Sequence, residues 1–250
     1  SSVYLILMAQ KSCPKMIERT ETGSHTRRTI KIIALMALVA AAVLLTAGTA
    51  AAETPINSCG FIINSPGEYV LTGDISGSGD CITVGASDVA IDGQGNRLTY
   101  TRAEAIELST AITNLTVRNI ELRADGGDEA IYLDEDTDGL FIENVDVTGD
   151  FEGGVYADSG SQANWIIADM RTTVDGEEYP IAMFNDEFSG TFRLEDSYLT
   201  SDDEAVIIDP EFVLDADFDI VRSTLFGRDF GAFEVLADDR RFRVYRAVKG

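Results

Sequence analysis

The chain has 250 residues, of which 45% are hydrophobic and 25% charged, a composition that is ordinary for a globular protein. Its 43 Asp and Glu residues against 19 Lys and Arg give a formal net charge of −24. So negative a chain is a poor partner for nucleic acid and for anionic membrane surfaces, and we expect neither.

Residues 1–52 read as an upstream segment followed by a signal peptide. Arg27, Arg28 and Lys31 form a basic region, residues 32–45 are uncharged and apolar, and a small-residue tail ends in Ala50 and Ala52. The apolar stretch is shorter than the ~20 residues that span a bilayer, so we expect cleavage after Ala52; an uncleaved membrane anchor is the alternative. The sequence therefore predicts an exported protein, extracellular or at the cell surface.

The charge balance changes sharply after residue 52. The remaining residues carry 13 basic and 41 acidic groups, and Lys249 is the only lysine among them. Such a surface repels itself over ~10 Å in dilute buffer but only over ~3 Å in molar salt. This favours a halophilic protein, and a merely acidic extracellular protein is the alternative.

Residues 53–80 precede the regular repeat, and we expect them to form an N-terminal cap and the first rung. Cys59 and Cys81 are 22 positions apart, close to one repeat. They could therefore lie on adjacent rungs, within the distance of a disulfide that export would favour. Otherwise they are two small buried residues.

Residues 81–250 repeat with a period of about 25 residues. Each copy begins with a large apolar residue and has an aliphatic residue two positions later; the copies start at Val89, Leu115, Leu140, Trp165, Phe192, Phe218 and Phe242. This alternation predicts a strand with one face inward. Asn119 and Asn144, at the fifth position, predict a corner, because Asn tolerates left-handed backbone angles and can bond the next Asn in a stack.

Apolar pairs before and after each copy predict two more strands per coil. Ile106 with Leu108 and Ile131 with Leu133 are examples of the preceding strand. The sequence therefore predicts an all-β fold, a right-handed parallel β-helix of about seven coils with three short strands per coil. A solenoid of amphipathic helices does not fit, because the apolar positions alternate by two and β-branched residues dominate them.

The residues CGFIINSPGEYVLTGDI, followed by CITVGASDVAIDGQGNRL, open a region that resembles the pectate-lyase-like right-handed β-helix superfamily. The opening is similar to that of secreted archaeal β-helix repeat proteins, and the resemblance covers residues 55–250. It implies the fold more than the function, because the superfamily includes polysaccharide lyases and hydrolases, a copper-delivery protein and many surface proteins. The only histidine, His25, precedes the expected cleavage site, which argues against a histidine-rich copper site.

One acidic turn has the composition of a cation-binding loop. Asp134, Asp136 and Asp138 alternate before Gly139, and three such carboxylates can wrap a hard cation such as calcium. The twelfth position of an EF-hand loop falls on Val145, an expected interior residue, so that motif is incomplete. A solvated acidic turn is the alternative.

A second acidic series recurs before a column of small residues and would stack into a ladder. It comprises Glu104, Asp128, Glu129, Glu152, Glu177, Glu178, Asp202, Asp203, Glu204 and Asp229. Glycosidic cleavage needs two carboxylates at a defined separation, and Asp202, Asp203 and Asp229 are the candidates for a catalytic role. A lyase would instead need calcium-held carboxylates and an Arg or Lys base, for which Arg193 and Arg243 are candidates. Hydrated surface charge is the favoured explanation of the acidic series, and an exposed charge ladder is the alternative for the two arginines.

These observations favour a structural or binding role over catalysis. We expect a partner among polysaccharides or other cell-surface components, or among divalent cations, with calcium as the possible cofactor. A polysaccharide lyase or glycoside hydrolase is the alternative. It ranks second because every acidic pair in so acidic a chain meets a loose spacing test, so the spacing of two carboxylates is weak evidence for catalysis.

Overall fold

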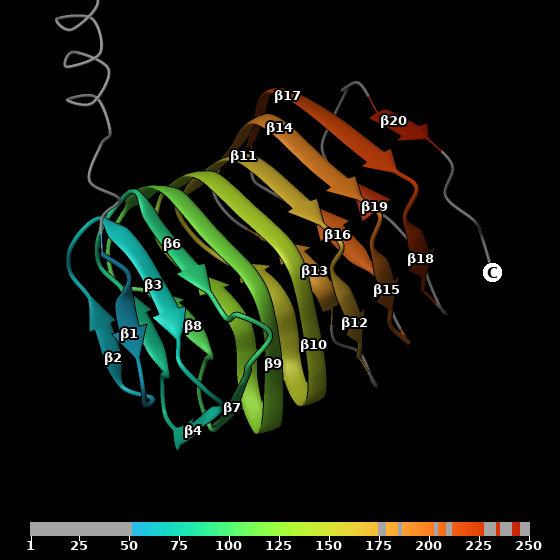
Figure 1. Cartoon of the computed structure of the whole chain (residues 1–250). Coiled ribbons are helices and arrows are strands. Elements are labelled where there is room, and N and C mark those ends of the chain that lie inside the picture. Colours follow the sequence, from blue (N-terminus) through green and yellow to red (C-terminus); the bar gives the residue numbers. More distant parts are fainter. Residues whose placement is uncertain are drawn as a thin grey trace, which may run out of the picture. The chain divides into compact units, whose positions relative to one another are not determined.

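The computed structural model describes residues 52–174, 179–184, 187–202, 205–208, 212–227, 234–235 and 242–245. They form a parallel β-solenoid of about six turns whose coils follow one another from the blue to the red strands of Figure 1. The predictions of an all-β parallel β-helix and of three strands per coil are confirmed. The turn count is slightly lower than the predicted seven, because seven equivalent first-face segments are separated by only six full turns. Residues 1–51, which hold most of the expected signal peptide, lie outside the described residues.

The strands stack in three columns, which we call the first, second and third faces. The first face consists of β1 (Thr54–Ile56), β3 (Gly67–Leu71), β6 (Val89–Asp92), β11 (Ser161–Ala168), β14 (Glu187–Glu195), β17 (Phe212–Val221) and β20 (Phe242–Tyr245). The second consists of β4 (Ile75–Ser78), β7 (Arg97–Thr101), β12 (Arg171–Thr173), β15 (Tyr198–Thr200) and β18 (Thr224–Phe226). The third consists of β2 (Phe61–Ile63), β5 (Ile82–Val84), β8 (Ile106–Leu108), β13 (Tyr179–Met183), β16 (Val206–Ile208) and β19 (Glu234–Val235).

Two strands run through all three faces without a break. These are β9 (Ile112–Leu133) and β10 (Thr137–Ala157), which pair with each other in parallel along almost their whole lengths. They bend at the corners instead of ending there. The central coils are therefore the most continuous part of the solenoid.

Equivalent apolar side chains stack in register to form the core. Ile142 pairs with Ile167, which pairs with Leu194 on the next coil, and all three are 0% exposed. Each buried aliphatic side chain of this kind contributes roughly 1.5–3 kcal/mol through the hydrophobic effect. The predicted aliphatic column is thus confirmed, and it supplies the driving force for stacking.

The predicted asparagine corner is also confirmed. Asn119 and Asn144 have φ values of 52° and 53°, in the left-handed region. The Asn144 Nδ2 group donates to Asn119 Oδ1 at 3.0 Å, which links the corners of adjacent coils. On later coils Asp196 and Arg222 occupy the same column, also with positive φ, and form an ion pair there. The corner thus keeps its backbone shape while its side-chain pairing changes from amides to charges.

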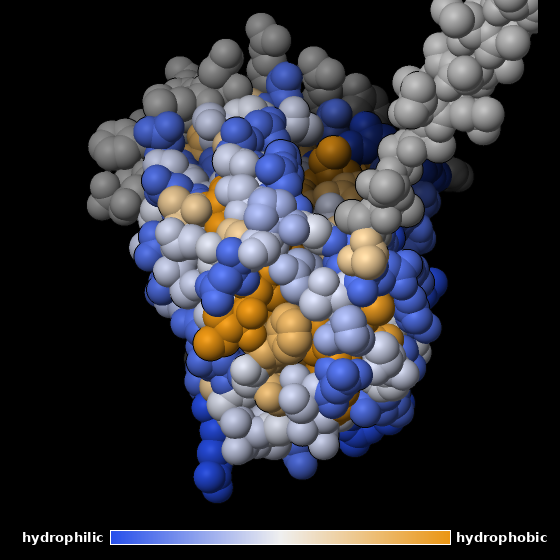
Figure 2. Space-filling model, turned by 60° about the vertical axis from the view of Figure 1, so that its left-hand side comes forward, coloured by the Kyte–Doolittle hydropathy of each residue, from blue (hydrophilic) through white to orange (hydrophobic). Residues whose placement is uncertain are grey.

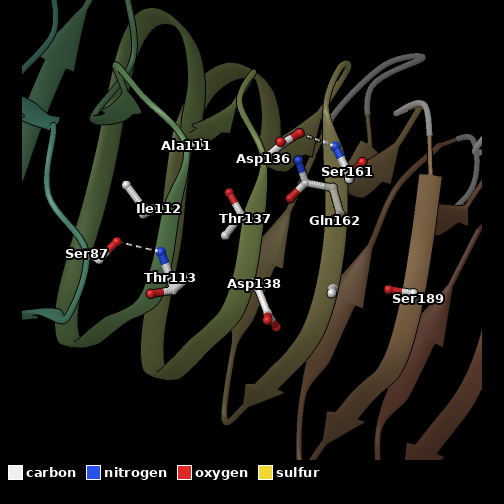
Figure 3. A pocket seen from close by; sticks show the side chains of 11 residues that line it. Ser87, Ala111, Ile112, Thr113, Asp136, Thr137, Asp138, Ser161, Gln162 and Ser189 are labelled. Carbon is white, nitrogen blue, oxygen red and sulfur yellow. Dashed lines mark hydrogen bonds between the residues drawn. The ribbon is translucent and has the colours of Figure 1, made fainter.

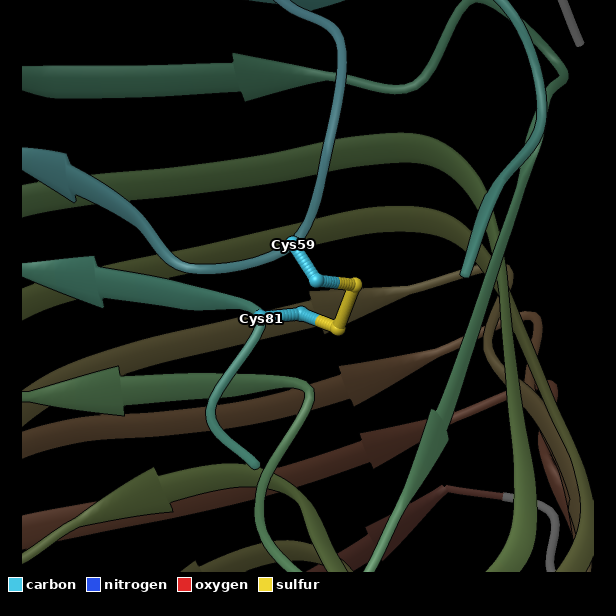
Figure 4. Close-up of a disulfide and its surroundings, with 2 residues drawn as sticks. All are labelled: Cys59 and Cys81. Atoms are coloured by element: carbon cyan, nitrogen blue, oxygen red, sulfur yellow. A yellow bond between two sulfur atoms is a disulfide. The ribbon is translucent and has the colours of Figure 1, made fainter. Parts of the chain in front are cut away.

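The N-terminal coils are closed by a covalent link. Cys59 and Cys81 form a disulfide, the pairing that their spacing allows (Figure 4). Gly77 approaches this bridge so closely that a Cβ atom there would lie 2.4 Å from the Cβ of Cys59. The cap therefore requires a glycine at that position.

The surface is predominantly hydrophilic. Figure 2 shows several small apolar areas among hydrophilic residues on the side that the N-terminal coils turn toward the viewer. Among the described residues only Ile62, Tyr198 and Phe226 are large hydrophobic side chains classed as exposed. Within the same residues no helix is long and apolar enough to cross a membrane.

Candidate functional site

A groove with a cavity volume of about 460 Å³ crosses the second face; we call it the Tyr198 groove. It collects residues of β10, β12 and β15, which stand side by side in Figure 1. Its lining residues are Asp146, Val147, Thr148, Gly149, Arg171, Thr172, Thr173 and Tyr198. The site is therefore built by three successive coils and not by a single loop.

The register of the second face places three different functional groups in one row. Asp146 pairs with Arg171, and Arg171 pairs with Tyr198, so each lies one rung from the next. Strand alternation turns these three side chains outward. The next residue along each strand, such as Thr172 after Arg171, points into the solenoid. The Tyr198 groove thus combines an acid, a guanidinium and an aromatic ring on one surface.

The charged pair in the groove is partly open to solvent, although the Asp146 Oδ1 atom itself is buried. Arg171 Nη1 lies 3.6 Å from Asp146 Oδ1, and the two side chains are 62% and 49% exposed. An ion pair so exposed adds little to stability. Both groups therefore keep free hydrogen-bonding capacity toward a ligand.

Aromatic side chains continue past the groove along the same face. Tyr198 is 49% exposed, and Phe226, on the next coil, is 46% exposed. Thr200 pairs with Phe226, so the second ring lies one rung and two residues from the first. Two exposed rings beside polar groups can bind a ligand that has both apolar faces and hydroxyl groups.

A second groove lies at the corner before the first face; we call it the corner groove (Figure 3). Its cavity volume is about 290 Å³. Its lining residues are Ser87, Ala111, Ile112, Thr113, Asp136, Thr137, Asp138, Ser161, Gln162, Ala163 and Ser189. Left-handed residues shape this corner, among them Asp88, Asn114 and Asn164, with φ values between 55° and 57°.

The predicted calcium residues fall at this corner but do not converge. Asp136 Oδ1 accepts the Ser161 backbone N–H at 2.7 Å, and Asp138 Oδ1 accepts Asn164 Nδ2 at 2.7 Å. Asp134 does not line the groove, and its Oδ1 atom is buried without a hydrogen-bond partner. In the described part of the chain no three His, Cys, Asp or Glu side chains gather closely enough to hold a metal ion. The calcium loop gains no support from this arrangement.

The predicted catalytic carboxylates are only partly described. Asp202 is exposed, whereas Asp203 and Asp229 lie outside the described residues. Of the candidate lyase bases, Arg193 forms an ion pair of 2.7 Å with Glu195 on its own strand, and the side chain of Arg243 is not described. The hydrolytic and lyase hypotheses stay predictions at these residues.

Burial raises the pKa of several carboxyl groups in and beside the acidic ladder. Burial, together with a hydrogen bond to Asp80, raises the pKa of Glu104 to about 7. Burial and the charge of Asp128 raise the pKa of Glu129 to about 7. Burial and Asp80 also raise the pKa of Glu107. The repeat predicted a carboxylate ladder, but it did not predict that Asp80 would interact with Glu104 and Glu107 at neighbouring positions.

The third face carries an aromatic row that the sequence reasoning missed. Tyr132 and Tyr156 stack with ring centroids 6.2 Å apart, and Tyr156 lies 5.8 Å from Phe184. Tyr132 Oη donates to Asp158 at 2.9 Å, and burial with this contact raises the pKa of Tyr132. For Tyr132 and Tyr156 the available signal was an aromatic residue at the outward position between two apolar ones; Tyr198, which follows Ser197, lacks that signal.

Comparison with known proteins gives no relative from which a function could be transferred: no family model, curated protein or solved structure matches the chain.

Proposed function

We propose that this chain is an exported or cell-surface β-helix that binds polysaccharide without cleaving it, through the Tyr198 groove. The observation that carries the proposal is an exposed aromatic ring in line with a solvent-facing Arg171–Asp146 pair in a groove of about 460 Å³. The parallel solenoid and the opening residues quoted above support membership of the pectate-lyase-like superfamily, near its secreted archaeal β-helix proteins.

The groove matches the two-sided chemistry of a sugar. A pyranose has an apolar C–H face, which can pack on the ring of Tyr198, and hydroxyl edges, which can both donate and accept. Arg171 offers donors in a planar fork, and Asp146 offers acceptors. Because the row extends across successive coils toward Phe226, it suits a chain of sugars better than a single one.

The test is binding of a panel of neutral and acidic polysaccharides, measured by calorimetry in high salt. We expect Tyr198→Ala to weaken binding at least about tenfold, which corresponds to about 1.4 kcal/mol, and Tyr198→Phe to retain most of it. Ile62→Ala is the matched control, because it removes an exposed apolar side chain from β2, outside the groove. Equal affinities for Tyr198→Ala and Ile62→Ala would refute the proposal.

One observation favours a second candidate function, cleavage of polysaccharide. A carboxyl group whose pKa is raised to about 7, as burial raises those of Glu104 and Glu129, is suited to act as a general acid. Incubation with acidic polysaccharides, with and without calcium, tests this directly. New reducing ends, or absorbance from unsaturated products, would replace the binding proposal with an enzymatic one.

The charge of the chain supports a halophilic setting for this function. With 41 acidic and 13 basic groups after residue 52, molar salt should relieve self-repulsion. The urea midpoint is therefore expected to rise between about 0.1 M and about 1 M salt. An unchanged midpoint would favour an ordinary acidic extracellular protein.

A further inference from the structure

The corner groove contains a buried acceptor that lacks a donor. Gln162 is only 1% exposed, and its Nε2 group donates to the carbonyl oxygens of Glu135 at 3.0 Å and Ser159 at 3.1 Å. These two bonds fix the orientation of the amide, so its other atom, Oε1, must be an acceptor, and Oε1 has no hydrogen-bond partner. A buried polar atom without a hydrogen-bond partner destabilises the folded state, and a donor from a ligand would recover that loss.

The groove is also negative and lacks a compensating cation. Asp136 and Asp138 line it, and no Lys, Arg or His is among the lining residues. The groups that donate to these two carboxylates, the backbone N–H of Ser161 and the amide of Asn164, are neutral. The groove therefore favours a ligand that is positively charged and rich in donors.

The shape of the groove selects an extended ligand over a metal ion. Each of five successive coils contributes to the lining: Thr113, Asp138, Ala163 and Ser189 pair in register, and Ser87 Oγ accepts the backbone N–H of Thr113 from the coil before. Four steps of ~4.8 Å give a length of ~19 Å. A volume of about 290 Å³ is several times the ~30 Å³ of a water molecule, and the carboxylates do not converge on one point.

We propose that the corner groove binds an extended organic polycation, a linear polyamine. Its ammonium groups pair with Asp136 and Asp138, and one of its N–H groups donates to Gln162 Oε1. The Ser and Thr hydroxyls along the groove accept from the remaining N–H groups. This site lies at the corner before the first face, whereas the Tyr198 groove lies on the second face, and it does not depend on the polysaccharide proposal.

The test is titration with spermidine, by calorimetry, in the lowest salt at which circular dichroism shows the protein folded. We expect the double variant Asp136→Asn, Asp138→Asn to bind at least about tenfold more weakly than the wild type. The asparagine side chains keep the acceptor oxygens for Ser161 and Asn164. The matched control, Glu143→Gln with Asp150→Asn, removes two exposed charges from the same strand outside the groove and should bind like the wild type.

A second measurement follows the site itself. Spermidine should shift the side-chain amide resonance of Gln162 in the wild type, and calcium at equal ionic strength should not. Equal weakening in both double variants would mean general attraction to an acidic surface and would overturn the proposal. A silent Gln162 resonance at saturating spermidine would also overturn it. Neither result would bear on Tyr198→Ala, so the two proposals fail separately.

Discussion

Breaking the link between Cys59 and Cys81 should destabilise the N-terminal coils by a calculable amount. The bridge closes a loop of 22 residues, and the chain-entropy relation for such a loop gives about 3 kcal/mol at 25 °C. We therefore expect the double variant Cys59→Ala, Cys81→Ala to lose about this much free energy of unfolding. Each Ala keeps the Cβ atom, so little packing is lost besides the sulfur atoms.

Urea denaturation followed by circular dichroism measures this loss. Reduction of the wild type with dithiothreitol is the matched experiment, because it removes the bond while keeping both sulfur atoms in place. The reduced wild type and the double variant should unfold at the same lower midpoint. If the reduced and oxidised wild types had the same midpoint, the reasoning from loop closure would be wrong. If only the variant were destabilised, lost packing and not the covalent link would be responsible.

Three further predictions concern the coils themselves. Because the folded pKa values of Glu104 and Glu129 lie near 7, above the ordinary value of 4.5, the folded state binds more protons between these pH values, so stability should fall as pH rises from 4.5 to 7. Replacing both with Gln should reduce this loss of stability by about 1 kcal/mol per group, a figure discounted for their partial exposure. Urea denaturation at several pH values between 4.5 and 7 measures the change. Ile142→Ala should cost about 2–5 kcal/mol in the same assay, whereas Glu143→Ala, on the exposed side, should stay within about 0.5 kcal/mol of the wild type. Asn144→Val should cost about 1–2 kcal/mol more than Asn144→Gly, because only the former strains the left-handed backbone; equal losses would assign the effect to the missing amide bond alone.

The scaffold was predictable because its determinants repeat along the chain. Val117, Ile142 and Ile167 recur at a fixed spacing, and that spacing alone is enough to infer that they stack. The corner at Asn119 and Asn144 followed from the break in alternation after each first-face strand. Local rules repeated over several coils average out the ambiguity of any single segment.

The sites were less predictable because they depend on what lies next to each repeated position. The acidic turn suggested a calcium loop, but Asp136 and Asp138 each bond to a residue 25 or 26 positions later and not to a shared ion. Gln162 gave no signal in the sequence, since its buried oxygen matters only once the amide is fixed by two carbonyls. The corner at Asn114 was harder to recognise in the sequence, because the equivalent residue on the following coil is Gly139 and not another Asn. Both residues have positive φ.

The bond between Asn144 and Asn119 implies that the molecule can change length in whole units. The two residues share a backbone conformation and a place on successive coils, so joining Asn119 directly to Val145 would excise one full turn and leave the new junction in register. Duplicating the same stretch would add one. Insertion and loss of such modules give evolution a way to lengthen or shorten both grooves in steps of a single rung without redesigning the interior.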